Sequence, residues 1–405
     1  MAATETAVAA PARSWEDYER AFAGVEAPFA LVDLDAMWSN AAEMLGRAAG
    51  KPIRVASKSL RCRSLLEAVL GRDGFKGLMT FTLPESLWLH EQGFDDLLLA
   101  YPSADRTALA RLGRLETDSP PIVMVDSAEH LDFIESAAGP GARPIRVCIE
   151  LDTSLWLAGG RFKFGAKRSP VRSPEQARSL AAEIVRRPGL ELAALMGYEA
   201  HIAGLGDRPL GKRLQPLAIR WMKRRSAAEI AERRAAVVAA VREVAPVRIV
   251  NGGGTGSIHS TVREECVTEV TAGSGLYAPT LFDRYDDFDL TPAAMFAMPV
   301  VRRPSGGVAT LLGGGYLASG AGAPDRVPEP YLPNGLRLDP QEGAGEVQTP
   351  VIGSAAATLR IGDRVYLRHA KAGELCERFD SLYLVSGGRI ADEVPTYRGE
   401  GRCFL

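Results

Sequence analysis

Cysteine is scarce in this chain, and the few cysteines present do not indicate disulfide bonds. The 405 residues contain five, Cys62, Cys148, Cys266, Cys376 and Cys403. Their number is odd and no Cys-x-x-Cys pair occurs, so a disulfide framework is not expected. This use of cysteine is typical of a reducing compartment, and we expect a cytoplasmic protein.

Long apolar runs and an excess of charge of one sign are also absent. No apolar run approaches the roughly 20 residues that a membrane span needs, and the formal net charge is only −2. Binding to nucleic acid or to an anionic membrane is therefore not expected. Residues Met1 to Arg13 lack the layout of a signal peptide, and a short disordered tail is expected there.

Short β-rich runs alternate with helical stretches across the first 280 residues. The predicted strands are Phe29–Asp35, Ile53–Ser59, Gly77–Thr82, Asp96–Tyr101, Ile122–Ser127, Ile145–Asp152, Leu192–Glu199 and Val247–Asn251. Several are almost entirely apolar, which favours a parallel sheet buried on both faces. Eight such strands alternating with helices predict an α/β fold, a (β/α)8 TIM-like barrel, with an open doubly wound sheet as the alternative.

Several predicted helices begin with residues that are typical of helix N-termini. Pro84 and Pro174 suit the first position of a helix, and Ser173 is a suitable N-cap residue. The helices are expected over Ser64–Leu70, Pro84–Gln92, Ala128–Ala137, Pro174–Arg187 and Ser226–Val244.

The character of the sequence changes after about Asp289, where glycine and proline become dense. Ser381–Val385 and Arg389–Ile390 flank a Ser-Gly-Gly turn, which predicts a β-hairpin. We therefore expect three parts: a tail and lead-in segment over 1–27, the barrel over 28–289, and an antiparallel β domain over 290–405.

A lysine at the end of one predicted strand is the first candidate for chemistry. Lys58 lies where barrel enzymes keep their active sites. Its amine could form a Schiff base with an aldehyde if burial or nearby positive charge promotes its deprotonated form. Taken alone, an ordinary surface lysine is the simpler interpretation.

A glycine-rich turn, Gly252-Gly253-Gly254-Thr255-Gly256, follows the last predicted barrel strand. Backbone N–H groups in such a turn form an anion cradle, and its glycines avoid Cβ clashes with a phosphate. The turn is neither a Walker loop nor a complete dinucleotide fingerprint. A tight structural loop is the alternative.

Three further residues lie where contacts to a ligand are possible. His201, in Gly-Tyr-Glu-Ala-His, could stack on a ring or form a hydrogen bond with it. Arg161 follows the sixth predicted strand and could bind a phenolate oxygen or a carboxylate. Tyr277 could bind a phosphate. Each also has a plain structural interpretation, as a core histidine, a loop charge or a core tyrosine.

Taken in order, these segments resemble the fold-type III pyridoxal-phosphate enzymes. The resemblance is to the branch of D-threonine aldolase and eukaryotic-type D-serine dehydratase, the amino acid deaminase/aldolase group, and more distantly to alanine racemase. It rests on the order of Val32–Asp35, Lys58, the segment ending in His201, the glycine-rich turn and Glu269–Tyr277, and covers about residues 28–390. It implies a barrel that holds pyridoxal 5'-phosphate, a C-terminal β domain, amino acid substrates and a homodimer.

The resemblance also implies roles for individual residues. Lys58 would be the Schiff-base lysine and a catalytic base, with His201 as a second catalytic candidate. His201 and Arg161 would contact the cofactor ring or its oxygen. The phosphate would be held by Gly253, Gly254, Thr255, Gly256 and Tyr277.

The chain departs from these relatives in two places. Ala56 and Leu60 stand where relatives carry histidines beside the lysine. Relatives also carry a closely spaced His-x-Cys or His-x-Asp metal pair, whereas His369 and Cys376 are seven positions apart here. These two residues are the metal-ligand candidates, and the use of a divalent metal is left open.

The resemblance therefore implies a pyridoxal-phosphate-dependent lyase acting on a 3-hydroxy amino acid of D configuration, by aldol cleavage or by dehydration and deamination. An amino-acid racemase is one alternative; it needs a second acid–base group, for which Tyr316 and Tyr331 are candidates. A non-catalytic cofactor-binding protein is another, although such relatives usually lack the extra β domain.

Overall fold

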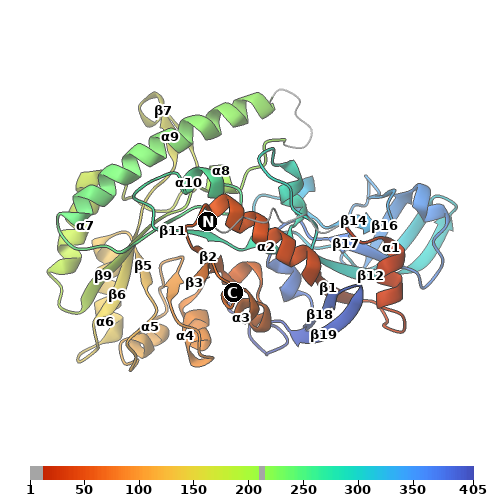
Figure 1. Cartoon of the computed structure of the whole chain (residues 1–405), viewed down its shortest axis with the longest axis horizontal. Coiled ribbons are helices and arrows are strands. Elements are labelled where there is room, and N and C mark those ends of the chain that lie inside the picture. The colour runs from red at the N-terminus through yellow and green to blue at the C-terminus, as the bar shows by residue number, and fades with distance from the viewer. Residues whose placement is uncertain (1–11, 209–214) are drawn as a thin grey trace, which may run out of the picture. The chain divides into compact units, whose positions relative to one another are not determined.

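A computed structural model of the chain describes residues 12–208 and 215–405 (Figure 1). They form two compact units. The barrel unit comprises Met44–Lys58, Glu67–Gly273 and Phe404–Leu405, and the sheet unit comprises residues 12–43, Ser59–Leu66 and Ser274–Cys403. The tail expected over Met1–Arg13 lies outside the described residues, apart from its last two positions. No helix in the described part of the chain is long and apolar enough to cross a membrane.

The described residues of the barrel unit contain eight parallel strands. They are β2 (Ile53–Ala56), β3 (Phe75–Thr80), β4 (Leu97–Leu99), β5 (Val123–Val125), β6 (Ile145–Glu150), β9 (Leu190–Gly197), β10 (Ile249–Gly252) and β11 (Glu269–Ala272). Their order in space is β4, β3, β2, β11, β10, β9, β6, β5. A parallel bridge between Leu98 and Ile122 joins the two ends. The predicted barrel is therefore confirmed.

Helices follow most of these strands in the sequence. They are α3 (Arg63–Leu70), α4 (Leu83–Glu91), α5 (Arg106–Leu112), α6 (Ala128–Ala138), α7 (Pro174–Val185) and the long α9 (Gln215–Arg242), prominent in Figure 1. Ser173 caps α7, as predicted, through a reciprocal pair of hydrogen bonds with Gln176. Helix α9 begins before the predicted Ser226, because the arginine, lysine and methionine residues in 220–225 are themselves good helix formers.

The prediction was wrong for the first barrel strand. Strand β1 (Phe29–Asp33) pairs with β12 (Ala294–Ser305) and β18 (Ser381–Ser386) in the sheet unit. The place in the barrel is taken by β11, which pairs with β10 and β2. All five residues of β1 are buried. Its apolar pattern is therefore the same as that of a barrel strand, and the pattern does not reveal which sheet the strand joins.

The sheet unit contains a mostly antiparallel sheet, which confirms the predicted β domain. Its strands are hydrogen-bonded side by side in the order β15, β16, β13, β12, β1, β18, β19. In addition, β17 pairs with β12 and β14. The remaining bounds are β13 (Val308–Leu312), β14 (Glu329–Leu332), β15 (Leu336–Leu338), β16 (Gln348–Gly353), β17 (Arg364–Arg368) and β19 (Arg389–Pro395). Strands β18 and β19 form the predicted hairpin. The turn between them contains Gly387 and Gly388, whose φ angles are +55° and +75°.

A buried ion pair crosses the interior of the barrel. The guanidinium of Arg54, with no exposed surface, donates to both carboxylate oxygens of Glu269, at 2.6 and 2.9 Å. It also donates to Asp96 at 2.9 Å. The side-chain amide of Asn251 donates to Glu269 at 2.7 Å. These bonds link β2, β10 and β11 through one charged pair.

Replacing Arg54 by methionine should destabilise the barrel. The change keeps much of the side-chain volume but leaves the Glu269 carboxylate buried without its cation. We expect the free energy of unfolding to fall by about 3–5 kcal/mol, measured by urea unfolding. Arg248→Met, at an exposed arginine beside β10, is the control and should change it by less than about 0.5 kcal/mol. Equal urea midpoints for the two variants would contradict this role of Arg54.

Candidate active site

Lys58 lies directly after β2, in a short 3-10 turn over Ser57–Ser59. Its side chain is exposed, and its Nζ donates a hydrogen bond to the Tyr101 hydroxyl at 2.9 Å. Tyr101 follows β4. The contact therefore joins the carboxyl ends of two barrel strands, the face on which barrel enzymes carry their active sites.

The Tyr101 hydroxyl lies near two cations. Besides Lys58, the Arg168 guanidinium carbon lies 5.1 Å from the centre of the Tyr101 ring. Burial on its own raises the pKa of Tyr101, but the positive charges of Lys58 and Arg168 outweigh it, so the pKa is lowered from its ordinary value. The phenolate form of Tyr101 is therefore stabilised here.

Arg168 links Tyr101 to a second tyrosine and to a buried carboxylate. Its guanidinium carbon lies 5.1 Å from the centre of the Tyr198 ring, and its Nη1 lies 3.4 Å from Glu150. Glu150 ends strand β6; burial raises its pKa, against the opposing effect of Arg168. Arg168 is thus positioned by two rings and one carboxylate.

The glycine-rich turn packs closely against Tyr198. A Cβ on Gly254 would lie 3.0 Å from a ring carbon of Tyr198 and 2.8 Å from the Cβ of Ala203, so there is no room for a side chain. Gly253 has a φ of +84°, a conformation that favours glycine. Both glycines therefore have a structural reason to be there.

These contacts form one continuous series within the barrel unit: Lys58, Tyr101, Arg168, Tyr198, Gly254. The lysine and the glycine-rich turn, which the sequence suggested as two parts of one site, are connected through three side chains. We call these five residues the site series.

Two backbone donors of the turn already have acceptors inside the protein. The N–H of Gly253 donates to Glu199 at 2.8 Å, and the N–H of Gly254 donates to the Ser257 hydroxyl at 3.0 Å. The Thr255 carbonyl accepts a hydrogen bond from Arg47 at 2.6 Å. The turn is therefore held in place by side chains from other segments.

Glu199 is part of a buried cluster of charges. Its carboxylate accepts from Arg234 at 2.7 Å and from the Thr261 hydroxyl at 2.8 Å. Arg234 also donates to Glu264 at 2.7 Å. Burial raises the pKa of Glu264 to about 7, although Arg234 opposes the shift.

The raised pKa of Glu264 predicts a pH dependence of stability. An unfolded glutamate releases its proton near its ordinary pKa, but folded Glu264 keeps its proton until about pH 7. The fold therefore loses stability as pH rises between these values, by up to roughly 3 kcal/mol. Glu264→Gln should lose less stability than wild type between pH 5 and pH 8 in urea unfolding.

The neighbouring exposed Glu265 provides the control. Glu265→Gln should keep the pH dependence of the wild type. If Glu264→Gln also keeps it unchanged, Glu264 is not the group responsible.

Two of the predicted site residues belong to the barrel unit but lie outside the site series. His201, on α8 (Ala200–Ala203), is buried and forms a hydrogen bond with Ser226 of α9; burial lowers its pKa. Arg161 is exposed between β7 (Leu155–Leu157) and β8 (Phe162–Phe164). Arg168, later in the same connection, makes the contact with Tyr101.

The other predicted residues belong to the sheet unit. The Tyr277 hydroxyl donates to the Leu60 carbonyl at 3.1 Å, and the Cys376 thiol donates to the same carbonyl at 3.0 Å. His369 meets the Tyr277 ring edge-on at 6.3 Å, and burial lowers its pKa to about 3. Within residues 12–208 and 215–405, no group of three or more His, Cys, Asp or Glu side chains is placed to hold a metal ion.

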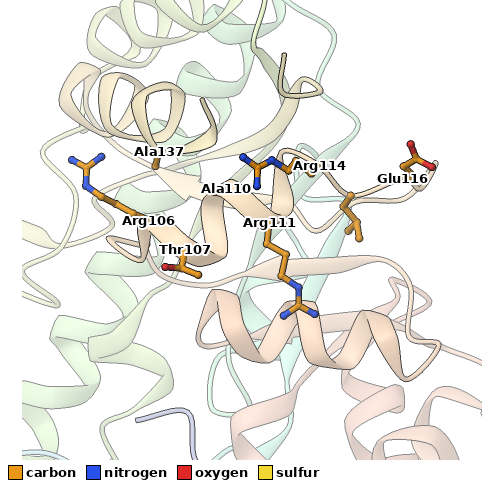
Figure 2. Close-up of a pocket in the computed structure, with 8 residues that line it drawn as sticks. Arg106, Thr107, Ala110, Arg111, Arg114, Glu116 and Ala137 are labelled. Atoms are coloured by element: carbon orange, nitrogen blue, oxygen red, sulfur yellow. The ribbon is translucent and has the colours of Figure 1, made fainter. Parts of the chain in front are cut away.

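A surface hollow lies beside α5, and Figure 2 shows the residues that line it. It includes none of the site series. The Arg106 guanidinium lies 4.3 Å from the Phe133 ring, and Arg111 pairs with Glu91. These arginines are therefore engaged with protein groups, and we assign no chemistry to the hollow.

Four polar residues in the site series or in contact with it were missed by sequence reasoning. Tyr101 and Glu150 lie at the carboxyl ends of two predicted strands, and this position in a barrel could have identified them. Tyr198 lies in the motif that drew attention to His201. Arg168 lies in an irregular segment, and no sequence signal marked it.

The alanine racemase N-terminal domain family matches residues 32–280, more than half of the chain. The chain belongs to this family. The resemblance to fold-type III pyridoxal-phosphate enzymes is thereby confirmed at the level of the family, for which pyridoxal phosphate is the expected cofactor.

Solved structures share the fold over nearly the whole chain. A D-threonine aldolase from Filomicrobium marinum has a TM-score of 0.75 and 20% identity, over 94% of this chain and 96% of that one. A D-threo-3-hydroxyaspartate dehydratase from Delftia sp. HT23 has a TM-score of 0.68 and 20% identity, over 92% and 98%. An alanine racemase from Clostridium difficile 630 has a TM-score of 0.60 and 13% identity, over 92% and 99%. Comparison with curated protein sequences found no significant match.

Proposed function

We propose that this protein is a pyridoxal-phosphate-dependent lyase that acts on a 3-hydroxy amino acid of D configuration. The observation that carries the proposal is the site series, which connects an exposed strand-end lysine to a glycine-rich turn. Family membership supports the cofactor. The choice of substrate is supported by the similar folds of a D-threonine aldolase and a D-threo-3-hydroxyaspartate dehydratase.

The residues of the barrel unit fit pyridoxal phosphate. Lys58 offers an exposed amine for its aldehyde, and the positive charges of Lys58 and Arg168 suit an anionic ligand. The Tyr198 ring provides an aromatic surface next to Gly254, where a Cβ has no room. When bound, the cofactor supplies an electron sink for charge that develops at the substrate Cα.

The phosphate would lie at the Thr255–Gly256 end of the turn. The N–H groups of Gly253 and Gly254 have protein acceptors, whereas Arg47 brings a cation to the Thr255 carbonyl. Contacts of the cofactor with Arg161, His201 and Tyr277 stay predictions, as does assembly into a homodimer.

Lys58 is the residue that acts at the substrate Cα. It takes the Cα proton in a dehydration, and it returns a proton to that carbon after an aldol cleavage. In the described residues the Cys376 thiol donates to a carbonyl, and no group of three or more His, Cys, Asp or Glu side chains forms a ligand set around His369. We therefore derive no step through a metal ion.

Covalent attachment of the cofactor tests the proposal most directly. Wild-type protein incubated with pyridoxal phosphate should gain a visible absorption band, and borohydride should fix the cofactor to Lys58, identified by peptide mass spectrometry. Lys58→Ala should lose both signals, because it lacks the amine. Lys76→Ala, at an exposed lysine of β3, should keep both. Wild type without a band or an adduct would rule the cofactor out.

A panel of amino acids tests the reaction class. We expect D-threonine and D-serine to give an aldehyde with glycine, or a keto acid with ammonia, and we expect D-alanine to be unchanged. L-Threonine is the control for configuration and should give no product. Formation of L-alanine from D-alanine, with no product from the hydroxylated substrates, would identify a racemase instead.

A further inference from the structure

The hydrogen bond between Lys58 and Tyr101 places a phenol next to the proposed reaction centre. The Tyr101 oxygen lies 2.9 Å from the Lys58 nitrogen. A substrate whose amino group replaces Lys58 on the cofactor aldehyde has to bring its Cα and Cβ close to the Lys58 nitrogen. Groups on these two carbons then come within hydrogen-bonding reach of Tyr101, which is the first requirement for an acid–base residue.

We propose that Tyr101 is a second catalytic residue, which takes the proton of the substrate 3-hydroxyl during carbon–carbon cleavage. This role rests on the proposed function and deepens it. It assigns the base that an aldol cleavage needs to a side chain of the barrel itself.

The surroundings of Tyr101 favour its phenolate as a base. In the described part of the chain, the charged and titratable groups shown to act on Tyr101 are the Lys58 amine, the Arg168 guanidinium, the Tyr198 hydroxyl and, through Arg168, the Glu150 carboxylate. The two cations lower the pKa of Tyr101 despite its burial. Arg168 therefore favours the phenolate form of Tyr101 over the neutral phenol.

The sequence neighbours of Lys58 and the predicted catalytic residue His201 are less suited to this role. Ala56 and Leu60, on either side of the lysine, have no acid–base group. The Nε2 of His201 is engaged with Ser226, and burial lowers the pKa of the ring. Tyr101 is hydrogen-bonded directly to Lys58. Its hydroxyl is therefore placed to take the proton of the substrate 3-hydroxyl.

The proposed step conserves atoms and charge. The Tyr101 phenolate takes the 3-hydroxyl proton, and the oxygen–hydrogen electron pair forms the aldehyde carbonyl. The Cα–Cβ bond breaks and its electron pair passes to Cα, where pyridoxal phosphate, when bound, would supply the electron sink. The Lys58 ammonium gives a proton to Cα, which completes glycine. Tyr101 then passes its proton to Lys58 along the hydrogen bond between them.

Tyr101→Phe tests this role, because it removes only the hydroxyl. We expect the variant to keep the borohydride-fixed adduct on Lys58 and to keep exchanging the Cα proton of glycine with heavy water. Glycine has no 3-hydroxyl, so this exchange reports on Lys58 alone. The kcat/KM for D-threonine cleavage should fall about 100-fold or more, the usual contribution of a positioned acid–base group.

The pH profile gives a readout that a merely structural role would not change. Wild-type kcat/KM for cleavage should rise with pH as Tyr101 loses its proton, and this rise should be absent in Tyr101→Phe. Tyr383→Phe serves as the control, because it removes a tyrosine hydroxyl from β18 in the sheet unit. We expect it to keep the wild-type rate and the wild-type pH profile.

Four results would overturn the role. Cleavage by Tyr101→Phe at the wild-type rate would show that the hydroxyl is not needed. Equal losses of cleavage and glycine exchange, or loss of the adduct, would assign Tyr101 to supporting Lys58 or binding the cofactor. Production of only keto acid from D-threonine by wild type would exclude the cleavage step. In contrast, a wild type without an adduct would refute the proposed function itself.

Discussion

The arrangement of the glycine-rich turn depends on the buried carboxylate of Glu199. It accepts hydrogen bonds from the backbone of Gly253, from Thr261 and from Arg234, and Arg234 also reaches the Gly197 carbonyl at the end of β9. The turn, a barrel strand and helix α9 are thereby positioned around a single charge. Because a buried charge without its partner costs several kcal/mol, none of these contacts can change independently of the others.

The same carboxylate shapes the electrostatics of the proposed phosphate site. A phosphate beside Glu199 would be repelled, and one guanidinium, that of Arg234, is shared between Glu199 and Glu264. Keeping Glu264 protonated relieves the excess of negative charge in this cluster. Arg47 at Thr255 adds a second cation on the turn. The turn binds an anion only if these positive groups outweigh the carboxylate, so its glycines alone do not make it a phosphate site.

The sequence allowed the barrel, the β domain and the two ends of the site series to be predicted. Lys58 and the glycine-rich turn were found because barrel sites lie at the carboxyl ends of strands, a rule that needs no knowledge of side-chain contacts. Arg161 and Arg168 lie in one long connection, and spacing alone does not tell which guanidinium folds back onto the barrel. The misassigned β1 has the same cause: its apolar residues specify burial, but the partner strands are chosen by tertiary packing.

The pairing of β1 has a consequence for the order in which the protein is made. A ribosome completes Phe29–Asp33 early, but the partners β12 and β18 begin at Ala294 and Ser381. All eight barrel strands lie between these points and have been synthesised before either partner exists. During that time β1 lacks the hydrogen bonds to both of its partner strands. An unpaired apolar strand can associate with other chains. Until β12 and β18 are made, the nascent chain therefore carries an unpaired apolar segment that a chaperone would protect.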